Sequence, residues 1–334
     1  MRQGKISESV LKRSVLKYID RSKEQTGKGA GVGEDCAFLT CGSGSLAVST
    51  QTFILPVTDA VKYALYAAVN NLAAGGSKAE YVTLAFTLPE ELPEPELQQM
   101  MKQAQEVCRE LEIQIIGGHT EVSDKVKAPV ITVTALGAHL TGEKVFREAD
   151  RKIPQNNLDI VMTKWIGLEG TAILAKEKEK ELLMRYPGSI IYTAQGFDRY
   201  LSLLPEAATA VMSGVYTMHD VRNGGVFGAL YELAKRMGVG LSIDLKQIPV
   251  KQETIEICEF FDINPYELLS GGSLLIVTAD GEKLVEALYE KGVEAAVIGK
   301  TTAGNDKVVL NEDETRYLEP AKPDEIFKID FMSV

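Results

Sequence analysis

Two glycine-bearing loops carry acidic side chains in a pattern that could hold phosphate and a metal ion. The stretch GAGVGEDCAF places Glu34 and Asp35 directly after glycines that end at Gly33. Glycines let backbone N–H groups crowd around an anion, and a neighbouring carboxylate can hold a hard cation against the phosphates. A second stretch, IIGGHTEV, contains Gly117, Gly118, His119, Thr120 and Glu121 after a short apolar run. An acidic surface turn and a plain tight turn are the alternative interpretations of these loops.

Two further loops combine glycines with polar side chains. In NNLAAGGSKAEY, Asn70 and Asn71 stand late in an expected helix, where asparagine can contact a ligand or satisfy the helix end. In MHDVRNGGVFGALYELA, Gly224 and Gly225 open an expected helix whose first N–H groups could receive an anion. The polar residues just before these glycines are His219, Asp220 and Arg222. An ordinary glycine-rich turn between strand and helix is the alternative, because no loop fits the Walker pattern or GxGxxG.

Composition limits the partners that the chain could bind. Its 334 residues are 45% hydrophobic and 25% charged, with a formal net charge of −11. No dense basic stripe of the kind that binds nucleic acid is visible. No apolar stretch approaches the roughly 18 residues of a membrane span, and the first ten residues lack a signal-peptide core. The absence of a basic stripe favours action on small molecules. The four cysteines lack CxxC spacing, so we expect reduced thiols in a cytoplasmic protein.

The elements that must position these loops form two α/β halves. In the first half, apolar periodicity predicts helices over 7–20, 58–76 and 94–112, and strands near 36–39, 45–50, 81–88, 113–118 and 128–140. In the second half it predicts strands over 158–164, 215–220, 239–245, 273–279 and 294–300, and helices over 167–177, 224–238 and 281–292. A polar, linker-like stretch near 147–157 divides the two. The predicted domains are therefore residues 1–152 and 153–334.

The order of the loops is more specific than any one of them. GVGEDCAF is similar to GxGDDAAV, AVNNLAAGGSKAEY to VNDLAxxGAxP, and IIGGHTEV stands for a GGDT loop. Later, TKWIGLEGTAILA, MHDVRNGGVFGALYELA and NPYELLSGGSLLIVTA are similar to KxIGxxGxAILA, MRDPTRGGLxxxLxE and NPxxLxxEGxLLIxV. Nearly end to end, the chain therefore resembles the AIR synthase-related (PurM-like) superfamily, and it looks closest to the HypE-like hydrogenase expression/formation branch.

The resemblance implies a two-domain α/β (α+β) homodimer in which the N-terminal sheet pairs with its twin. It also implies ATP in a cleft between the domains, Mg²⁺ held by the N-domain loops, and phosphoryl transfer that activates an oxygen atom of a small molecule. Carried over onto this sequence, the metal ligands are Asp35, Glu34 and Glu121. The cofactor-binding positions carried over are Lys5, Gly33, Glu34, Asp35, Gln51, Asn71, Gly117, Gly118, His119, Thr120, Gly224 and Gly225.

The sequence departs from the family pattern at its metal positions. Gln51, Asn71 and His119 stand where the family commonly has aspartate, so we expect weaker binding of Mg²⁺, which prefers carboxylate oxygens. The chain ends IFKIDFMSV, and its last cysteine is Cys258, whereas HypE proper ends in a cysteine that accepts a carbamoyl group. We therefore expect a reaction other than hydrogenase cyanide synthesis.

Two readings of function follow from this pattern. The first is an ATP-dependent enzyme acting on a small molecule, and the alternative is a catalytically degenerate nucleotide-binding homodimer with a regulatory or structural role. A metal-dependent hydrolase built on His119, Glu121 and His139 is a third possibility. It is weakened because successive strand residues point to opposite faces, so that spacing alone does not bring these side chains together.

Overall fold

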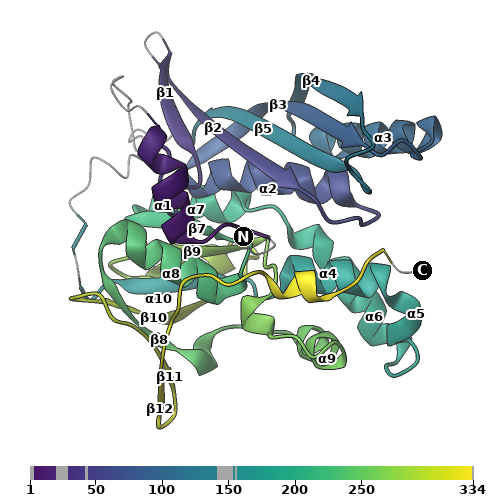
Figure 1. Ribbon diagram of the computed structural model, residues 1–334. Coiled ribbons are helices and arrows are strands. Elements are labelled where there is room, and N and C mark those ends of the chain that lie inside the picture. The colour runs from purple at the N-terminus through teal and green to yellow at the C-terminus, as the bar shows by residue number, and fades with distance from the viewer. Residues whose placement is uncertain (1–3, 20–28, 42–43, 141–152, 155, 333–334) are drawn as a thin grey trace.

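Two sheets with helices packed against them organise the chain (Figure 1). The computed structural model describes residues 4–19, 29–41, 44–140, 153–154 and 156–332. The first sheet has the order β1 (Ala37–Cys41), β2 (Gly44–Phe53), β5 (Val130–His139), β3 (Ser77–Leu88), β4 (Gln114–Val122). The second has the order β12 (Glu314–Tyr317), β11 (Lys307–Asn311), β8 (Gly240–Asp244), β10 (Ala295–Thr302), β6 (Asp159–Thr163), β9 (Ser273–Thr278), β7 (Thr217–Val221). The expected two-domain α/β fold is confirmed. The domain boundary after residue 152 borders a stretch outside the described residues and stays a prediction.

The helices show where sequence periodicity is informative. In the first half they are α1 (Glu8–Ser14), α2 (Ala60–Ala74) and α3 (Glu94–Glu110). In the second half they are α4 (Leu168–Glu177), α5 (Glu179–Leu182), α6 (Gly188–Gln195), α7 (Leu204–Ser213), α8 (Gly225–Met237), α9 (Gln252–Phe260) and α10 (Gly281–Tyr289). Helices α5, α6 and α7 and the hairpin β11–β12 were not expected, because such short elements offer few apolar repeats to detect. None of the described helices has the length and apolar character needed to cross a membrane.

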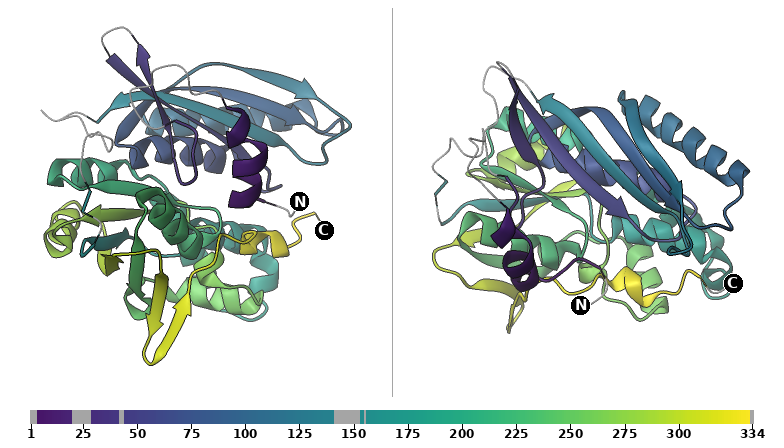
Figure 2. Two further views of the ribbon diagram at one scale, coloured as in Figure 1. Left: turned by 60° about the vertical axis from the view of Figure 1, so that its left-hand side comes forward. Right: turned by 45° about the horizontal axis from the view of Figure 1, so that its top comes forward.

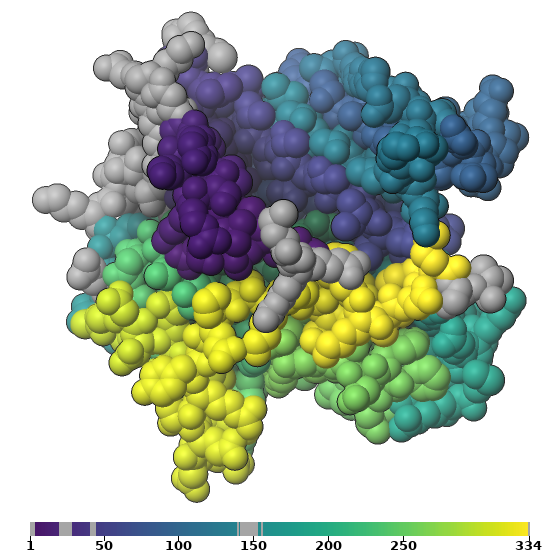
Figure 3. Space-filling model, in the orientation of Figure 1, coloured from purple at the N-terminus to yellow at the C-terminus, as the bar shows by residue number. Residues whose placement is uncertain are grey.

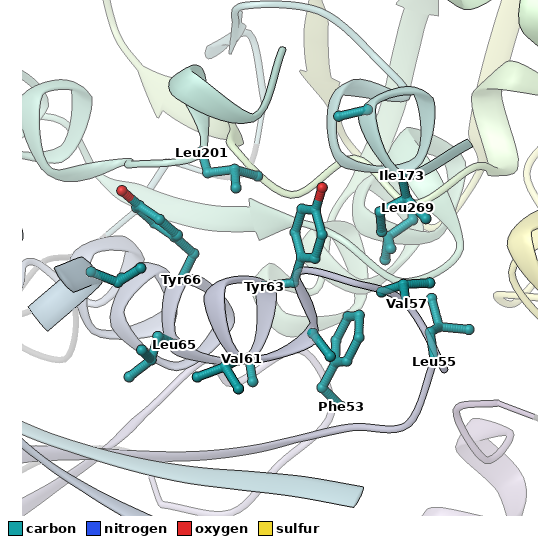
Figure 4. Packing of buried hydrophobic residues seen from close by; sticks show 14 of the residues in the cluster. Phe53, Leu55, Val57, Val61, Tyr63, Leu65, Tyr66, Ile173, Leu201 and Leu269 are labelled. Atoms are coloured by element: carbon teal, nitrogen blue, oxygen red, sulfur yellow. The ribbon is translucent and has the colours of Figure 1, made fainter. Parts of the chain in front are cut away.

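Helix α2 joins the two domains because it packs between the first sheet and the second domain. Its residues are almost all buried, and it contributes to a core cluster that contains residues of both domains. Tyr63 and Tyr66 point toward the second domain, where Leu201 lies (Figure 4). Asn70 adds two hydrogen bonds across the same interface, donating to the Leu201 oxygen at 2.7 Å and accepting from the Leu203 N–H at 3.0 Å. The two domains are therefore held in one relative orientation, which fixes the shape of any cleft between them.

Strand β4 corrects the expectation that the two glycines of IIGGHTEV form a turn. The strand runs through both glycines and pairs in parallel with β3. Ile115 and Gly117 pair with consecutive residues of β3, so Ile116 is the extra residue of a β-bulge. A Cβ atom at Gly118 would lie 1.8 Å from the backbone oxygen of Leu84. Gly118 is therefore needed for a close approach of two backbones within the sheet, whereas a Cβ atom at Gly117 would meet no atom within 4 Å.

Candidate functional site

A cleft of about 440 Å³ lies where the two domains and both ends of the described chain meet. Its walls come from residues 4–8, 31–35, 51–55, 219–220, 222–223, 320–321 and 326–327, with further side chains from α8. The N-terminal and C-terminal segments lie next to each other on this face of the molecule (Figure 3). The volume falls in the range of about 300–1,000 Å³ that is typical of small-molecule sites. Six of the residues predicted from the sequence line it: Lys5, Gly33, Glu34, Asp35, Gln51 and Asn71.

The predicted residues of IIGGHTEV do not line this cleft. Gly117, Gly118, His119, Thr120 and Glu121 lie on the edge strand β4 and are all exposed. The side chains of His119 and Glu121 are 72% and 56% exposed, with Nε2 and Oε2 3.6 Å apart. This stretch was expected to form one wall of a nucleotide cleft, but it is no part of the lining of this cleft, because the bulged strand carries it along the sheet edge. Its contact with nucleotide stays a prediction.

The N-terminus of α8 was expected to receive a phosphate, but another group of the chain already occupies it. The Gly224 N–H donates to Asp324 Oδ2 at 2.6 Å, and Asp324 Oδ1 accepts from the N–H groups of Leu269 and Ile326. Burial raises the pKa of Asp324 to about 7, although these three N–H groups favour its ionised form. A Cβ atom at Gly225 would lie 2.3 Å from a backbone oxygen. The two glycines therefore serve a tight turn capped by the C-terminal segment.

Five charged side chains of alternating sign form a continuous line, which we call the charge row, and all of them except Arg236 line the cleft. In order, they are Arg236, Asp35, His219, Glu232 and Lys5. Asp35 Oδ2 lies 3.4 Å from Arg236 Nη1 and 2.9 Å from His219 Nδ1. Glu232 continues the row, with Oε2 3.4 Å from His219 Nε2 and Oε1 2.6 Å from Lys5 Nζ. The row runs from the buried Arg236, which is 4% exposed, to Lys5, which is 45% exposed.

The charge row perturbs the protonation of its members. Burial alone would lower the pKa of His219, but the adjacent Asp35 and Glu232 carboxylates raise it to about 9. Burial would raise the pKa of Glu232, but the neighbouring His219 imidazole and the charge of Lys5 lower it to about 2. The imidazole is therefore a cation at neutral pH, and Glu232 is an anion. Groups with perturbed pKa values that meet in a cleft are typical of functional sites.

Both domains hold Asp35 in the charge row. On the second-domain side, Arg236 Nη1 donates to the Gly33 oxygen at 3.0 Å. Gly33 has φ +74°, and a Cβ atom there would lie 2.9 Å from the Glu232 backbone oxygen. On the first-domain side, Asn71 Nδ2 donates to Ser49 Oγ at 3.0 Å, and that hydroxyl donates to the Asp35 backbone oxygen at 3.1 Å. Glycine at position 33 thus lets the loop lie close against α8 and brings Asp35 to His219.

Two further buried groups border the row. Arg222 forms a two-point ion pair with Glu169, at 3.0 and 3.1 Å, and its guanidinium lies 5.6 Å from the Phe53 ring centre. Asp220 is 6% exposed, and its Oδ1 has no hydrogen-bond partner among the described residues. Burial raises the pKa of Asp220 to about 7, and the charge of Asp35 adds to the effect. Asp220, like Asp324, is therefore a buried acid whose protonation changes near neutral pH.

The residues predicted to bind Mg²⁺ do not fit that role together. Asp35 already contacts two basic side chains, and Glu121 lies on the exposed edge strand. Gln51 and Asn71 line the cleft but are uncharged. Within the part of the chain that the structure describes, no three or more histidine, cysteine, aspartate or glutamate side chains are grouped so that they could hold a metal ion. Only Glu34 and Asp35, of the three predicted ligands, share the cleft.

The sequence interpretation missed two second-domain members of the charge row, Glu232 and Arg236. Glu232 and Arg236 are four residues apart on α8, a spacing that places both on one helix face. That spacing indicates that one face of α8 is charged. The sequence near α8 does not show that His219 and Asp35 lie opposite this face. Asp324 was missed for the same reason, since its partner Gly224 is 100 positions away.

Family comparisons agree with this architecture. Residues 33–139 match the N-terminal domain of AIR synthase related proteins, and residues 158–311 match the C-terminal domain. A putative hydrogenase expression/formation protein of Methanocaldococcus jannaschii is 25% identical over 92% of this chain and 91% of its own length. The carbamoyl dehydratase HypE of Rhizobium leguminosarum is 24% identical over 83% of this chain and 79% of its own.

Solved structures of this fold are also similar. The hydrogenase maturation protein HypE in complex with ATP has a TM-score of 0.70 at 18% identity, covering 97% of both chains. At this identity the likeness establishes the fold. Together, the two family matches span most of the chain, including the loop that carries Asp35 and the strand that carries His219. The chain belongs to the AIR synthase related protein family.

Proposed function

We propose that the cleft binds ATP and that the protein uses it to activate an oxygen atom of a small molecule by phosphoryl transfer. The observation that carries this proposal is the meeting, in one cleft, of the glycine-bearing loop 31–35 with Gln51 and Asn71 of the first domain and residues 219–220 and 222–223 of the second. Two relatives support it. A HypE structure of the same fold is in complex with ATP, and another relative is named carbamoyl dehydratase. Loss of water from an amide requires an activated oxygen, which phosphorylation supplies.

Each wall of the cleft has a role in this proposal. Phosphoryl transfer depends mainly on positioning and on neutralising charge, rather than on covalent chemistry by the protein. Lys5, at the exposed end of the charge row, would contact a phosphate, and the backbone of residues 31–33 would lie along the phosphate chain. Gln51 and Asn71 would offer amide groups for hydrogen bonds with the nucleotide.

A second candidate is a nucleotide-binding protein without turnover, which serves a regulatory or structural role. It is favoured by the uncharged Gln51 and Asn71 at family aspartate positions and by the engagement of Asp35 with His219 and Arg236. Both candidates require nucleotide in the same cleft. They differ only in whether the protein transfers a phosphoryl group from the bound nucleotide to an acceptor.

Titration calorimetry with ATP tests the shared step. We expect binding by the wild-type protein and an affinity at least tenfold lower for Lys5→Ala, because a lost phosphate contact costs about 1.4 kcal/mol or more. Lys78→Ala is the matched control. Lys78 lies on β3 of the first sheet, forms an ion pair with Glu112 and does not line the cleft. No binding at millimolar ATP would refute both candidates. Binding without ADP release across a panel of hydroxyl, carboxylate and amide acceptors would favour the second.

We further propose that a second copy of the chain covers the open face of the first sheet. Helices α2 and α3 pack against one face, whereas no described helix covers the other (Figure 2). The middle parts of the central strands place uncharged side chains on that face, while Lys78 lies at one end of β3. These uncharged side chains are Val48, Thr50, Thr52, Thr83, Ala85, Thr132, Thr134 and Leu136. Depletion of charge is typical of the core of a protein interface, and here it contrasts with a net charge of −11.

This dimer bears on the residues of β4 that lie outside the cleft of their own chain. His119 and Glu121 pair with Ala85 and Thr87 of β3, so they point to the same open face. The predicted contact of Gly117–Thr120 with nucleotide therefore requires the second copy and stays a proposal.

Sedimentation measures the oligomeric state directly. We expect a dimer for the wild-type protein and a monomer for Thr52→Arg/Thr132→Arg, because two buried cations on each copy would be desolvated without partners. Thr315→Arg, on the exposed strand β12, makes the same change elsewhere and should leave the dimer intact. A monomeric wild-type protein at tens of micromolar would exclude this interface.

A further inference from the structure

We propose that the cleft binds the phosphates of its nucleotide without a divalent cation, and that the charge row takes the metal's place. This inference rests on the proposed nucleotide binding and adds how the charge of the phosphates is balanced. It starts from the disagreement between the predicted Mg²⁺ ligands and the groups that surround them in the structure.

The first reason is that Asp35 is engaged with basic groups of the protein. One of its oxygens, Oδ2, contacts both His219 Nδ1 at 2.9 Å and Arg236 Nη1 at 3.4 Å. All three side chains are at least nine-tenths buried. A magnesium ion bound to this oxygen would have to lie close to two buried basic side chains. In a poorly solvated site, repulsion between like charges at such distances is strong.

The second reason is that positions 51 and 71, where the family commonly has aspartate, offer no carboxylate. Gln51 and Asn71 are neutral, and the Asn71 amide nitrogen is used to hold Ser49. Magnesium sites in nucleotide enzymes usually combine one or two carboxylates with phosphate oxygens. Asp220 is the remaining buried carboxyl group in the lining with an oxygen that lacks a partner among the described residues, and its neighbours His219 and Arg222 are basic.

The third reason is that the same groups can serve a phosphate directly. The charge row has three basic and two acidic side chains, and the adjacent Arg222–Glu169 pair adds one of each sign. Lys5 lies at the exposed end, where its ammonium group can approach a ligand while it still contacts Glu232. The row and this pair together therefore carry one basic group in excess, while the carboxyl groups of the lining outside them are Glu8, Glu34 and Asp220. The excess lies on the side of Lys5 and His219, where it favours an anionic phosphate over a second cation.

Calorimetric titration with ATP, in EDTA and in excess MgCl₂, tests the inference. We expect the two dissociation constants of the wild-type protein to agree within about threefold. An affinity at least tenfold higher with MgCl₂ would overturn the inference while leaving nucleotide binding intact. No binding in either solution would refute the proposed function itself, and the inference with it.

Restoring carboxylates supplies the matched variant. Gln51→Asp/Asn71→Asp should bind ATP at least tenfold more weakly in EDTA, because two negative charges then face the phosphates, and MgCl₂ should restore the affinity. Since Asn71 is buried, Gln51→Asp alone is the second variant, and thermal melting confirms that each is folded. Equal affinities of both variants in the two solutions would show that these positions do not face the phosphates, which would also overturn the inference.

Discussion

Replacing Asp35 by asparagine is expected to lower the free energy of unfolding by about 3–5 kcal/mol, the usual cost of removing one partner from a buried ion pair. Asp35 contacts His219 and Arg236, and each of these side chains is only 4% exposed. The asparagine amide has nearly the same shape, but it cannot balance two buried cations. Urea unfolding followed by circular dichroism measures the change, and the slope with urea should remain close to that of the wild-type protein.

The control for this substitution is Asp124→Asn. Asp124 pairs with Lys125 on the surface, and its side chain is 59% exposed. Exposed ion pairs contribute little to stability, so this variant should stay within about 0.5 kcal/mol of the wild-type protein. A loss below about 1 kcal/mol for Asp35→Asn would mean that the charge row does not depend on this carboxylate.

The second large effect is a loss of stability as the pH rises from about 6.5 to 9. The pKa of His219 is about 9 in the folded protein and about 6.5 when unfolded, so the folded state binds the proton more tightly. This contribution is fully present below pH 6.5 and disappears as the pH passes 9. Each pKa unit corresponds to about 1.4 kcal/mol, which makes the total on the order of 3 kcal/mol.

The measurement compares urea unfolding of wild-type protein and His219→Gln at a series of pH values. The quantity of interest is the difference in unfolding free energy between the two proteins. This subtraction is needed because burial raises the pKa of Asp220 to about 7, so that Asp220 also destabilises the fold as the pH rises from about 4 to 7. The groups facing the imidazole are Asp35, Glu232 and Arg236. If the two proteins lose stability in parallel between pH 6.5 and 9, His219 is not the group responsible.

The sequence located the elements that repeat a pattern over many residues. Helix α2 and strand β3 were found within a few residues because long apolar patterns constrain the choice. The double glycine at 117–118 was misread because a turn and a β-bulge favour the same residues, and only pairing with β3 distinguishes them. The interpretation of Gly224 failed differently, since the helix does begin there but a distant carboxylate caps it.

The candidate site could be predicted on one side only. Lys5, Asp35 and Gln51 were predicted from segments of the first domain that resemble the family, and all three line the cleft. The basic groups opposite them depend on how α8 packs against the loop at Gly33, and that contact is tertiary. Charge patterns along a helix predict a charged face but do not identify the segment that it meets.

The way in which the cleft joins both ends of the described chain has a consequence for biosynthesis. Lys5 and its partner Glu232 are 227 positions apart, and Gly224 must await Asp324, 100 positions further on. Gly4 packs against Phe327, which leaves the ribosome later still. Domains fold largely as they emerge, so the first sheet can form early while the cleft is still open on one side. A nascent chain halted before residue 324 would thus carry a nearly finished fold and an unfinished pocket, which delays ligand capture until both domains have been made.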